Sequence, residues 1–271
     1  YYYQTKTVKK QICLHFTVGV LPGDIATLTK ADNHMSVQYV VDRLGFIYRL
    51  FPDDYWSYHL GSTAIGGNSV MSKQSIGIEI SNYGPLRFKD GKYLDAYGNT
   101  YTTDVSLVDS VSYRGYDYYA KMTERQKEAV ARLLVYLSER HNIPLKFKEY
   151  IGEVFGSAEE AVAFRGIFCH SNVRQDKYDL PPEMTLQIKD VLDKITKPSD
   201  PEPPKEEPKE EPPKEEAAPV ETAQEEPKHD YHVEETPKGD LVIVDKAATP
   251  VEAPKKSWWQ RLVEFLRSAF E

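Results

Sequence analysis

In the stretch "KQICLHFTV" (residues 10–18), large apolar side chains alternate with smaller or polar ones, which predicts a β-strand with one face buried in a core. Successive side chains of a strand point to opposite sides. Cys13, His15 and Thr17 would therefore share one face, and the large apolar side chains between them would share the other. A lone histidine on a strand is more often structural than a ligand, so His15 needs support from elsewhere in the chain.

Other β-rich runs extend the prediction to a sheet. They are residues 35–43, 45–51, 73–81 and 165–171. The first two follow each other so closely that they predict a hairpin turning near Leu44-Gly45. Together with the helices described next, these runs predict one α/β domain over residues 1–197.

The clearest helix is "TERQKEAVARLLVYLSERHNIP" (residues 123–144). Thr123 and Gln126 form a capping-box pattern at its start, and Pro144 supplies a stop. Its apolar face, which should lie on the sheet, consists of Ala129, Val130, Leu133, Leu134 and Leu137. A second helix is predicted from about Pro182 to Ile195. Residues 84–120, with seven tyrosines, predict an insertion exposed at the rim of a site.

The composition changes abruptly at Pro198. Residues 198–256 are rich in Pro, Glu and Lys and predict a disordered, stiffened linker. Residues 257–271 ("SWWQRLVEFLRSAFE") predict a short amphipathic helix. Two hypotheses for this helix stay open: it lies on a membrane surface, or it docks on a protein partner.

The charge distribution argues against nucleic acid as a partner. Residues 198–271 hold 19 of the 42 acidic side chains and only 10 of the 34 basic ones. The remainder is close to neutral and has no basic stripe of the kind that nucleic acid requires. Two cysteines are too few for a disulfide scaffold, no run reaches the length of a transmembrane helix, and no export signal is visible.

A second stretch, "FCHSNVRQDKYDLPP" (residues 168–182), combines a histidine, cations and two aspartates. Zinc sites that hydrolyse a bond use about three protein ligands and leave one position open. His15, His170 and Asp179 could supply that set, with Asp176 as the alternative to Asp179. Spacing along the chain carries no information on whether these side chains meet.

Five stretches resemble the zinc-dependent N-acetylmuramoyl-L-alanine amidases of the amidase 2 type, the family that includes peptidoglycan recognition proteins and phage lysozyme-amidases. In the family's order they are "ICLHFTVG" (12–19), "MSVQYVVDRLGFIYRLFPDD" (35–54), "YWSYHLGS" (55–62), "QSIGIEISNYG" (74–84) and "CHSNVRQDKYDLPP" (169–182). The resemblance implies a central mixed β-sheet flanked by helices, followed here by the linker and the terminal helix.

The resemblance also implies roles for single residues. Zn²⁺ would be the cofactor, held by His15, His170 and Asp179. Lys177 matches the cation that faces the developing oxyanion, and Glu79 matches the carboxylate that manages the proton of the attacking water. Two further side chains, His59 and Arg174, could contact the substrate. The ligand loop is shorter than in many relatives, which keeps Asp176 open.

The implied reaction is hydrolysis of the amide bond between N-acetylmuramic acid and L-alanine in peptidoglycan. A cell-wall lysin of a phage or a bacterium, acting at the cell envelope or after secretion, is the expected setting. Two alternatives stay open. One is a peptidoglycan-binding module that keeps the fold without hydrolysis, and the other is a zinc peptidase that acts on the stem peptide.

Overall fold

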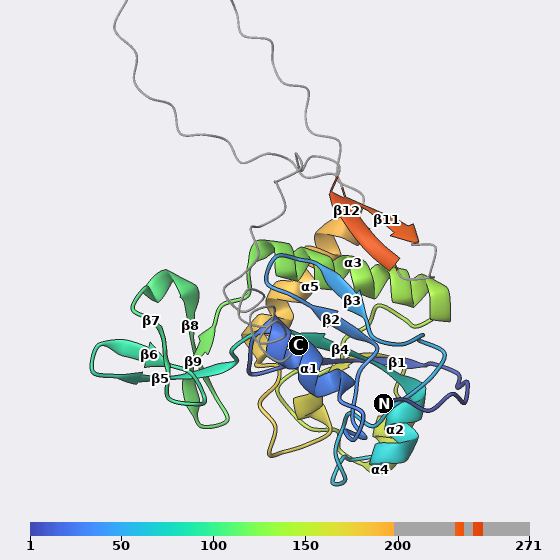
Figure 1. Ribbon diagram of the computed structural model, residues 1–271. Coiled ribbons are helices and arrows are strands. Elements are labelled where there is room, and N and C mark those ends of the chain that lie inside the picture. Colours follow the sequence, from blue (N-terminus) through green and yellow to red (C-terminus); the bar gives the residue numbers. More distant parts are fainter. Residues whose placement is uncertain (198–230, 236–240, 246–271) are drawn as a thin grey trace, which may run out of the picture. The chain divides into compact units, whose positions relative to one another are not determined.

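A computed structural model of the chain describes residues 1–197, 231–235 and 241–245, and a central five-stranded sheet organises the first of these ranges (Figure 1). Its strands, in spatial order, are β10 (Gly166–Cys169), β1 (Gln11–Phe16), β4 (Ser75–Ile80), β2 (Tyr39–Val41) and β3 (Ile47–Arg49). The first four are parallel to one another, and the edge strand β3 is antiparallel to β2. The predicted mixed sheet and the β2–β3 hairpin are therefore confirmed.

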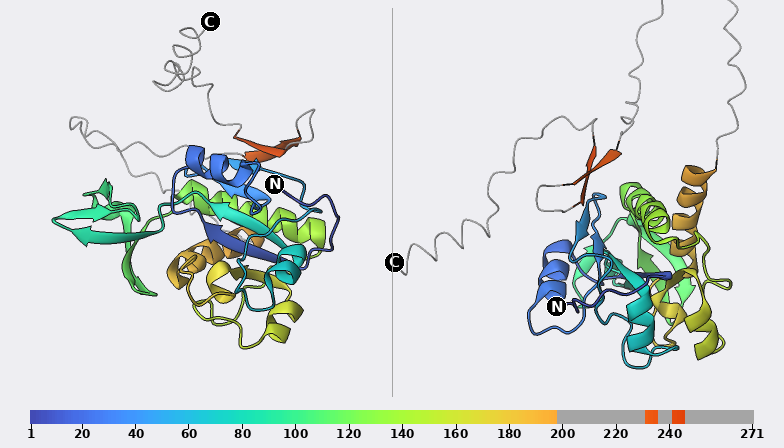
Figure 2. Two further views of the ribbon diagram at one scale, coloured as in Figure 1. Left: turned by 60° about the horizontal axis from the view of Figure 1, so that its bottom comes forward. Right: turned by 90° about the vertical axis from the view of Figure 1, so that its right-hand side faces the viewer.

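Helices lie on both sides of this sheet (Figures 1 and 2). Two long helices, α3 (Glu124–His141) and α5 (Pro182–Thr196), pack on one face and enclose the main hydrophobic core. The shorter elements are α1 (Leu21–Thr29), α2 (Asn68–Gln74), α4 (Ala158–Ala163) and the 3₁₀ turns η1 (Val105–Leu107) and η2 (His170–Asn172). Sequence analysis predicted α3 and α5 but not α2 and α4, which are too short for a periodic pattern.

Alternation along β1 and β4 separates core from site. Ile12, Leu14 and Phe16 belong to the core beneath α3 and α5, as do the isoleucines of β4. Cys13 belongs instead to a second apolar cluster on the other side of the sheet. His15 and Glu79 are register partners in neighbouring parallel strands, so both extend from this second side. The sheet therefore brings two polar groups to one surface.

The start of α3 differs in one detail from the predicted capping box. Thr123 Oγ1 accepts a hydrogen bond from the backbone N–H of Gln126 at 3.1 Å, as predicted. The side chain of Gln126 does not return to Thr123 but donates to the carbonyl oxygens of Val41 and Ser81 in the sheet. It therefore joins the helix to the sheet. The helix ends before Pro144, because Asn142 adopts a left-handed conformation with φ of 52°.

The predicted insertion, residues 84–120, forms a sheet of its own that projects from the domain (Figure 2). Its antiparallel strands are β5 (Pro85–Lys89), β6 (Lys92–Leu94), β7 (Thr100–Thr102), β8 (Val108–Tyr113) and β9 (Tyr116–Ala120), in the order β7-β6-β5-β9-β8. A small cluster of Leu86, Tyr93 and Ala120 packs beneath tyrosines of the same sheet. Sequence analysis predicted the insertion but not its strands.

A second unit of the chain contains the antiparallel strands β11 (Tyr231–Glu235) and β12 (Leu241–Asp245). Both fall inside the range predicted as linker, and the sequence analysis did not expect them. The rest of that range and the predicted helix at 257–271 lie outside the described residues. Within the described residues, no helix has the length and apolar character needed to cross a membrane.

Candidate metal centre and active site

Three polar side chains meet on the sheet face opposite α3 and α5. His15 extends from β1, and His170 follows directly after the neighbouring strand β10. Asp179 lies nine residues further on, and its backbone carbonyl accepts a hydrogen bond from Ser171 N–H at 2.8 Å, which folds the loop back on itself. Only 2%, 7% and 5% of His15, His170 and Asp179 are exposed to solvent. Their meeting therefore depends on strand pairing and on this loop closure.

The three ligand atoms form a nearly regular triangle. Nδ1 of His15 lies 3.1 Å from Nδ1 of His170, and Oδ2 of Asp179 lies 3.1 Å from the second nitrogen and 3.5 Å from the first. Tetrahedral zinc with bonds of about 2.0–2.1 Å to nitrogen and oxygen sets its ligand atoms ~3.3 Å apart. The triangle has the dimensions of one face of such a site.

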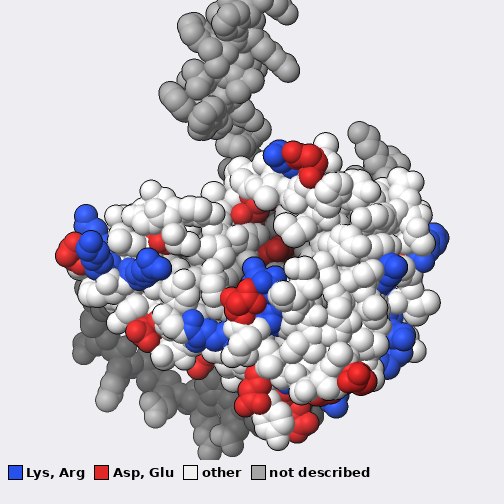
Figure 3. Space-filling model, turned by 90° about the horizontal axis from the view of Figure 1, so that it is seen from below, with Lys and Arg blue, Asp and Glu red and all other residues white. Residues whose placement is uncertain are grey.

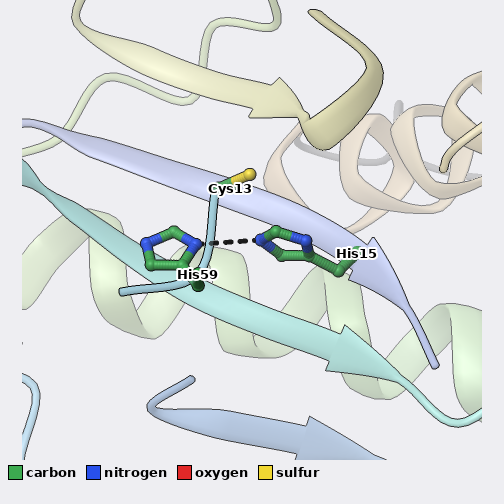
Figure 4. A group of neighbouring side chains, drawn as sticks. All are labelled: Cys13, His15 and His59. Atoms are coloured by element: carbon green, nitrogen blue, oxygen red, sulfur yellow. Dashed lines mark hydrogen bonds between the residues drawn. The ribbon is translucent and has the colours of Figure 1, made fainter. Parts of the chain in front are cut away.

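A chain of hydrogen bonds assigns the proton on His15, and Figure 4 shows its last link, between His59 and His15. Ser75 uses its hydroxyl proton to donate to the carbonyl of Met71 at 2.7 Å, so it accepts from His59 Nε2–H at 3.0 Å. His59 Nδ1 is then an acceptor and takes the Nε2–H of His15 at 3.0 Å. The Nδ1 atom of a neutral His15 consequently carries a lone pair.

The same reasoning applies to His170. Its Nε2 lies 3.0 Å from the carbonyl oxygen of Leu60, which can only accept, so the proton sits on Nε2. Two nitrogen lone pairs and a carboxylate oxygen therefore converge, with no hydrogen between them. A cation satisfies such a set, and the donors fit zinc. The residues present thus fit the metal that the family resemblance implies.

Burial keeps the imidazoles of His15 and His59 neutral. Removal from water, reinforced by the neighbouring His170, lowers the pKa of His15 to about 4. Burial and the proximity of His15 also lower the pKa of His59 well below its ordinary value. Neutral rings are the form in which histidine binds a metal.

A second group, Cys13, His15 and His59, also has its ligand atoms close together. Here the nitrogens of the two histidines already share a proton, and burial raises the pKa of Cys13 well above its ordinary value, which disfavours the thiolate. This group therefore lacks the converging lone pairs of a metal site. Both cysteines are free and buried in different apolar clusters, Cys13 on the side of the site and Cys169 in the main core.

Glu79 and Lys177 line a pocket of about 290 Å³ that opens over the triangle of His15, His170 and Asp179. Burial, reinforced by the negative charges of Asp179 and Asp24, raises the pKa of Glu79 well above its ordinary value, and Lys177 acts in the opposite direction. Oε2 of Glu79 is buried and has no hydrogen-bond partner among the described residues. A carboxyl group in this state can take up and return a proton.

The pocket lies in a hollowed surface where basic and acidic side chains gather (Figure 3). A neighbouring pocket of about 390 Å³ shares Thr17, Thr27, Leu28 and Glu79 with it and is also lined by Tyr97 of the insertion. The insertion thus borders the site, as the sequence analysis expected. The contributions of Thr27 and Leu28 were missed, because no chemical motif marks them.

The remaining predicted site residues lie around the triangle. Asp176, the alternative third ligand, is exposed and forms an ion pair with Arg174, away from the histidines. Arg174 lines the pocket of about 290 Å³ over the triangle. Gly61, with φ of 80°, leaves room there for its guanidinium. His59 also borders this pocket, but both of its ring nitrogens bond to protein.

The chain belongs to the N-acetylmuramoyl-L-alanine amidase family, whose model, Amidase_2, matches residues 4–182. This match confirms the resemblance carried by the five stretches. It covers the central sheet, the insertion and the whole loop from His170 to Pro181.

Several solved structures are similar to the chain at low identity. AmiD from E. coli, an N-acetylmuramyl-L-alanine amidase solved with anhydro-N-acetylmuramic acid-L-Ala-D-gamma-Glu-L-Lys, is 19% identical, with a TM-score of 0.45 over 69% of this chain and 59% of AmiD. AmpDh3 from Pseudomonas aeruginosa is 16% identical, with a TM-score of 0.43 over 69% of this chain and 61% of AmpDh3. The amidase LysC from Clostridium intestinale is 16% identical, with a TM-score of 0.38 over 69% and 87%.

The chain thus spans about three fifths of the first two of these structures. No curated protein matches the chain.

Proposed function

We propose that this protein is a zinc-dependent amidase that hydrolyses the bond between N-acetylmuramic acid and L-alanine in peptidoglycan. The observation that carries the proposal is the convergence of two histidine lone pairs and one carboxylate beside Glu79 and Lys177. Family membership supplies the substrate class.

His15, His170 and Asp179 would hold the zinc ion. When bound, zinc polarises a carbonyl group and makes a water molecule more nucleophilic. The protein's part is to keep both imidazoles in one tautomer. Leu60 does this for His170 through its carbonyl, and the chain from His59 to Met71 does it for His15.

Glu79 acts as the general base and then as the general acid. It lies beside His15 in the sheet and opens into the pocket, and one of its carboxylate oxygens has no hydrogen-bond partner within the part of the chain that the structure describes. It would take the proton of the attacking water and deliver it to the leaving nitrogen of L-alanine. A raised pKa suits both steps, because proton transfer is most efficient when the pKa lies near the working pH.

Lys177 acts on the carbonyl oxygen. It is half-buried, lines the same pocket and lies close enough to lower the pKa of both His15 and Glu79. As the carbonyl becomes tetrahedral its oxygen gains negative charge, which a fixed cation stabilises more than it stabilises the planar substrate.

The decisive experiment treats purified cell walls of several stem-peptide types with the full-length, zinc-loaded protein. New L-alanine amino termini without new reducing sugars would support the amidase. Amino termini within the stem peptide would instead indicate a peptidase. Retention on the walls without any release would indicate a binding module. Either of the latter results would overturn the proposal.

His59 is expected to strengthen metal binding although it is not a ligand. Its replacement by phenylalanine removes the acceptor of the His15 Nε2–H bond and should lower zinc affinity about 10–100-fold. Competition with a chromophoric chelator measures this effect without reference to activity. Replacement of the exposed His34 is the control and should leave affinity unchanged. A zinc affinity of His59→Phe equal to that of the wild type would show that the hydrogen bond from His15 to His59 does not contribute to metal binding.

We also propose that residues 257–271 attach the enzyme to a membrane surface or a protein partner. The support is the amphipathic pattern of two tryptophans with regularly spaced apolar residues. Deletion of these residues should abolish co-sedimentation with anionic vesicles or with envelope fractions and leave hydrolysis of soluble wall fragments unchanged. Undiminished sedimentation of the deletion variant would contradict this role.

The proposed setting is the cell envelope, reached by secretion or, for a phage-encoded enzyme, from within the infected host. This setting is supported by the proposed substrate, because peptidoglycan lies in the cell envelope and the enzyme must reach it there.

A further inference from the structure

The turn between β8 and β9 connects the insertion to the loop that carries the active-site residues. Its two central residues, Arg114 and Gly115, have φ of 48° and 87°, as a tight two-residue hairpin turn requires, and Tyr113 pairs with Tyr116 across it. The turn therefore points Arg114 in a fixed direction. The proposal below rests on the function proposed above.

The guanidinium of Arg114 is surrounded by backbone carbonyl oxygens of the loop between His170 and Asp179. The two N–H groups of Nη1 are shared among three carbonyls, those of Arg174 at 2.7 Å, Gln175 at 3.2 Å and Lys177. Nη2 donates to the carbonyl of Ser171 at 2.9 Å. One side chain thus binds four carbonyl groups of a single loop.

Neighbouring aromatic side chains hold the same contact together. Tyr113 donates its hydroxyl to the carbonyl of Gly152 at 3.0 Å, and Arg114 Nη2 reaches that same carbonyl at 3.5 Å. On the other side of the turn, Tyr116 packs edge-on against Tyr178, with ring centroids 5.2 Å apart. The hairpin therefore contacts the loop through Arg114 and Tyr116, and it contacts the neighbouring segment at Gly152 through Tyr113.

The contacted loop has little regular structure of its own. Beyond the 3₁₀ turn, its backbone hydrogen bonds include one from Lys177 N–H to the carbonyl of Arg174 at 3.3 Å. Another runs from Ser171 N–H to the carbonyl of Asp179. Gln175 and Asp176 are exposed. Without a donor from outside, the carbonyls of Ser171 and Lys177 would have to find water, and the loop could adopt other conformations.

We propose that Arg114 is a positioning residue for catalysis: it fixes the backbone of residues 171–177 and so places Lys177 over the substrate carbonyl and Asp179 at the metal. The insertion is then part of the catalytic machinery and not merely a wall of the substrate groove. A guanidinium suits the task, because its five donors lie in one plane and can reach several carbonyls at once.

The test compares Arg114→Ala and Arg114→Lys with Arg87→Ala in the full-length, zinc-loaded protein. Arg87 is an exposed arginine of the same sheet and serves as the matched control. We expect Arg114→Ala to lower kcat about 100-fold with a smaller change in KM, since a displacement of about 1 Å can cost that much. Arg114→Lys should restore little, because an ammonium group cannot span the carbonyls, whereas added guanidinium ion should restore part of the rate of Arg114→Ala.

Hydrogen exchange provides a readout independent of activity. Peptides covering residues 170–180 should lose protection in Arg114→Ala, while those from β1, β4 and α3 keep it. Wild-type protection in the loop, or an equal loss throughout the domain, would overturn the proposal. If Arg114→Ala fails to fold, Arg114→Lys takes its place in the same comparison.

Failure of the proposed function is distinguishable from failure of this inference. A wild-type protein that releases nothing from cell walls would overturn the amidase, while hydrogen exchange of the loop would still decide whether Arg114 positions it. An active wild type with an equally active Arg114→Ala would overturn the positioning role alone.

Discussion

Replacement of Asp179 by alanine is expected to abolish zinc binding and to lower the rate of amide hydrolysis by roughly 10³-fold or more, because the metal supplies several kcal/mol of transition-state stabilisation. Asp179 provides the only carboxylate oxygen that lies within 3.5 Å of both His15 Nδ1 and His170 Nδ1 in the described part of the chain. Zinc content after gel filtration and initial rates on soluble wall fragments measure the two effects.

Asp176→Ala is the matched control, since it removes the other aspartate of the same loop. That carboxylate is exposed and paired with Arg174, so this variant should bind zinc like the wild type. The reverse pattern, with zinc lost in Asp176→Ala and kept in Asp179→Ala, would show that the ligand assignment is wrong.

Replacement of Glu79 by glutamine is expected to lower kcat about 10²–10⁴-fold and to leave zinc affinity nearly unchanged. Glutamine keeps the shape of the side chain but cannot accept the proton of the attacking water. Steady-state kinetics on a soluble muropeptide, together with zinc titration, separates this effect from a loss of metal. A fast Glu79→Gln variant with normal zinc content would rule out Glu79 as the base.

The pH profile of the wild type should report the same group. A general base must be deprotonated, so kcat/KM falls as the pH drops through its pKa. Because burial raises the pKa of Glu79, this fall should begin at a higher pH than for an ordinary glutamate, with a pKa of 4.5. The acidic limb attributable to this group should be absent from the profile of Glu79→Gln.

Sequence predicted those features that follow from a local pattern. Alternation along residues 12–17 placed His15 opposite the core, and the period of the apolar residues from Ala129 to Leu137 gave the face of α3. The resemblance then identified the residues that the structure brings together. Gln126 shows the limit of such patterns, because its side chain bonds to two carbonyls of the sheet that lie far from it in sequence.

The supporting contacts of the site could not be predicted in this way. The proton chain from Met71 to His15 joins residues whose relative positions depend on the whole sheet. Arg114 followed by Gly115 signals a turn, but nothing in the sequence shows that this turn reaches a loop about sixty residues away. Tertiary packing decides such contacts, and one sequence does not display it.

The alternation of β1 also constrains how this domain can change over evolutionary time. A single residue gained just before Ile12 would exchange the two sides of the strand, placing His15 among the aliphatic side chains beneath α3 and Leu14 beside His170. Neither side of the strand would tolerate the exchange, because the core side requires apolar side chains and the site requires the nitrogen lone pair of His15. Point substitutions can alter core and chemistry separately along this strand, whereas length changes must damage both together.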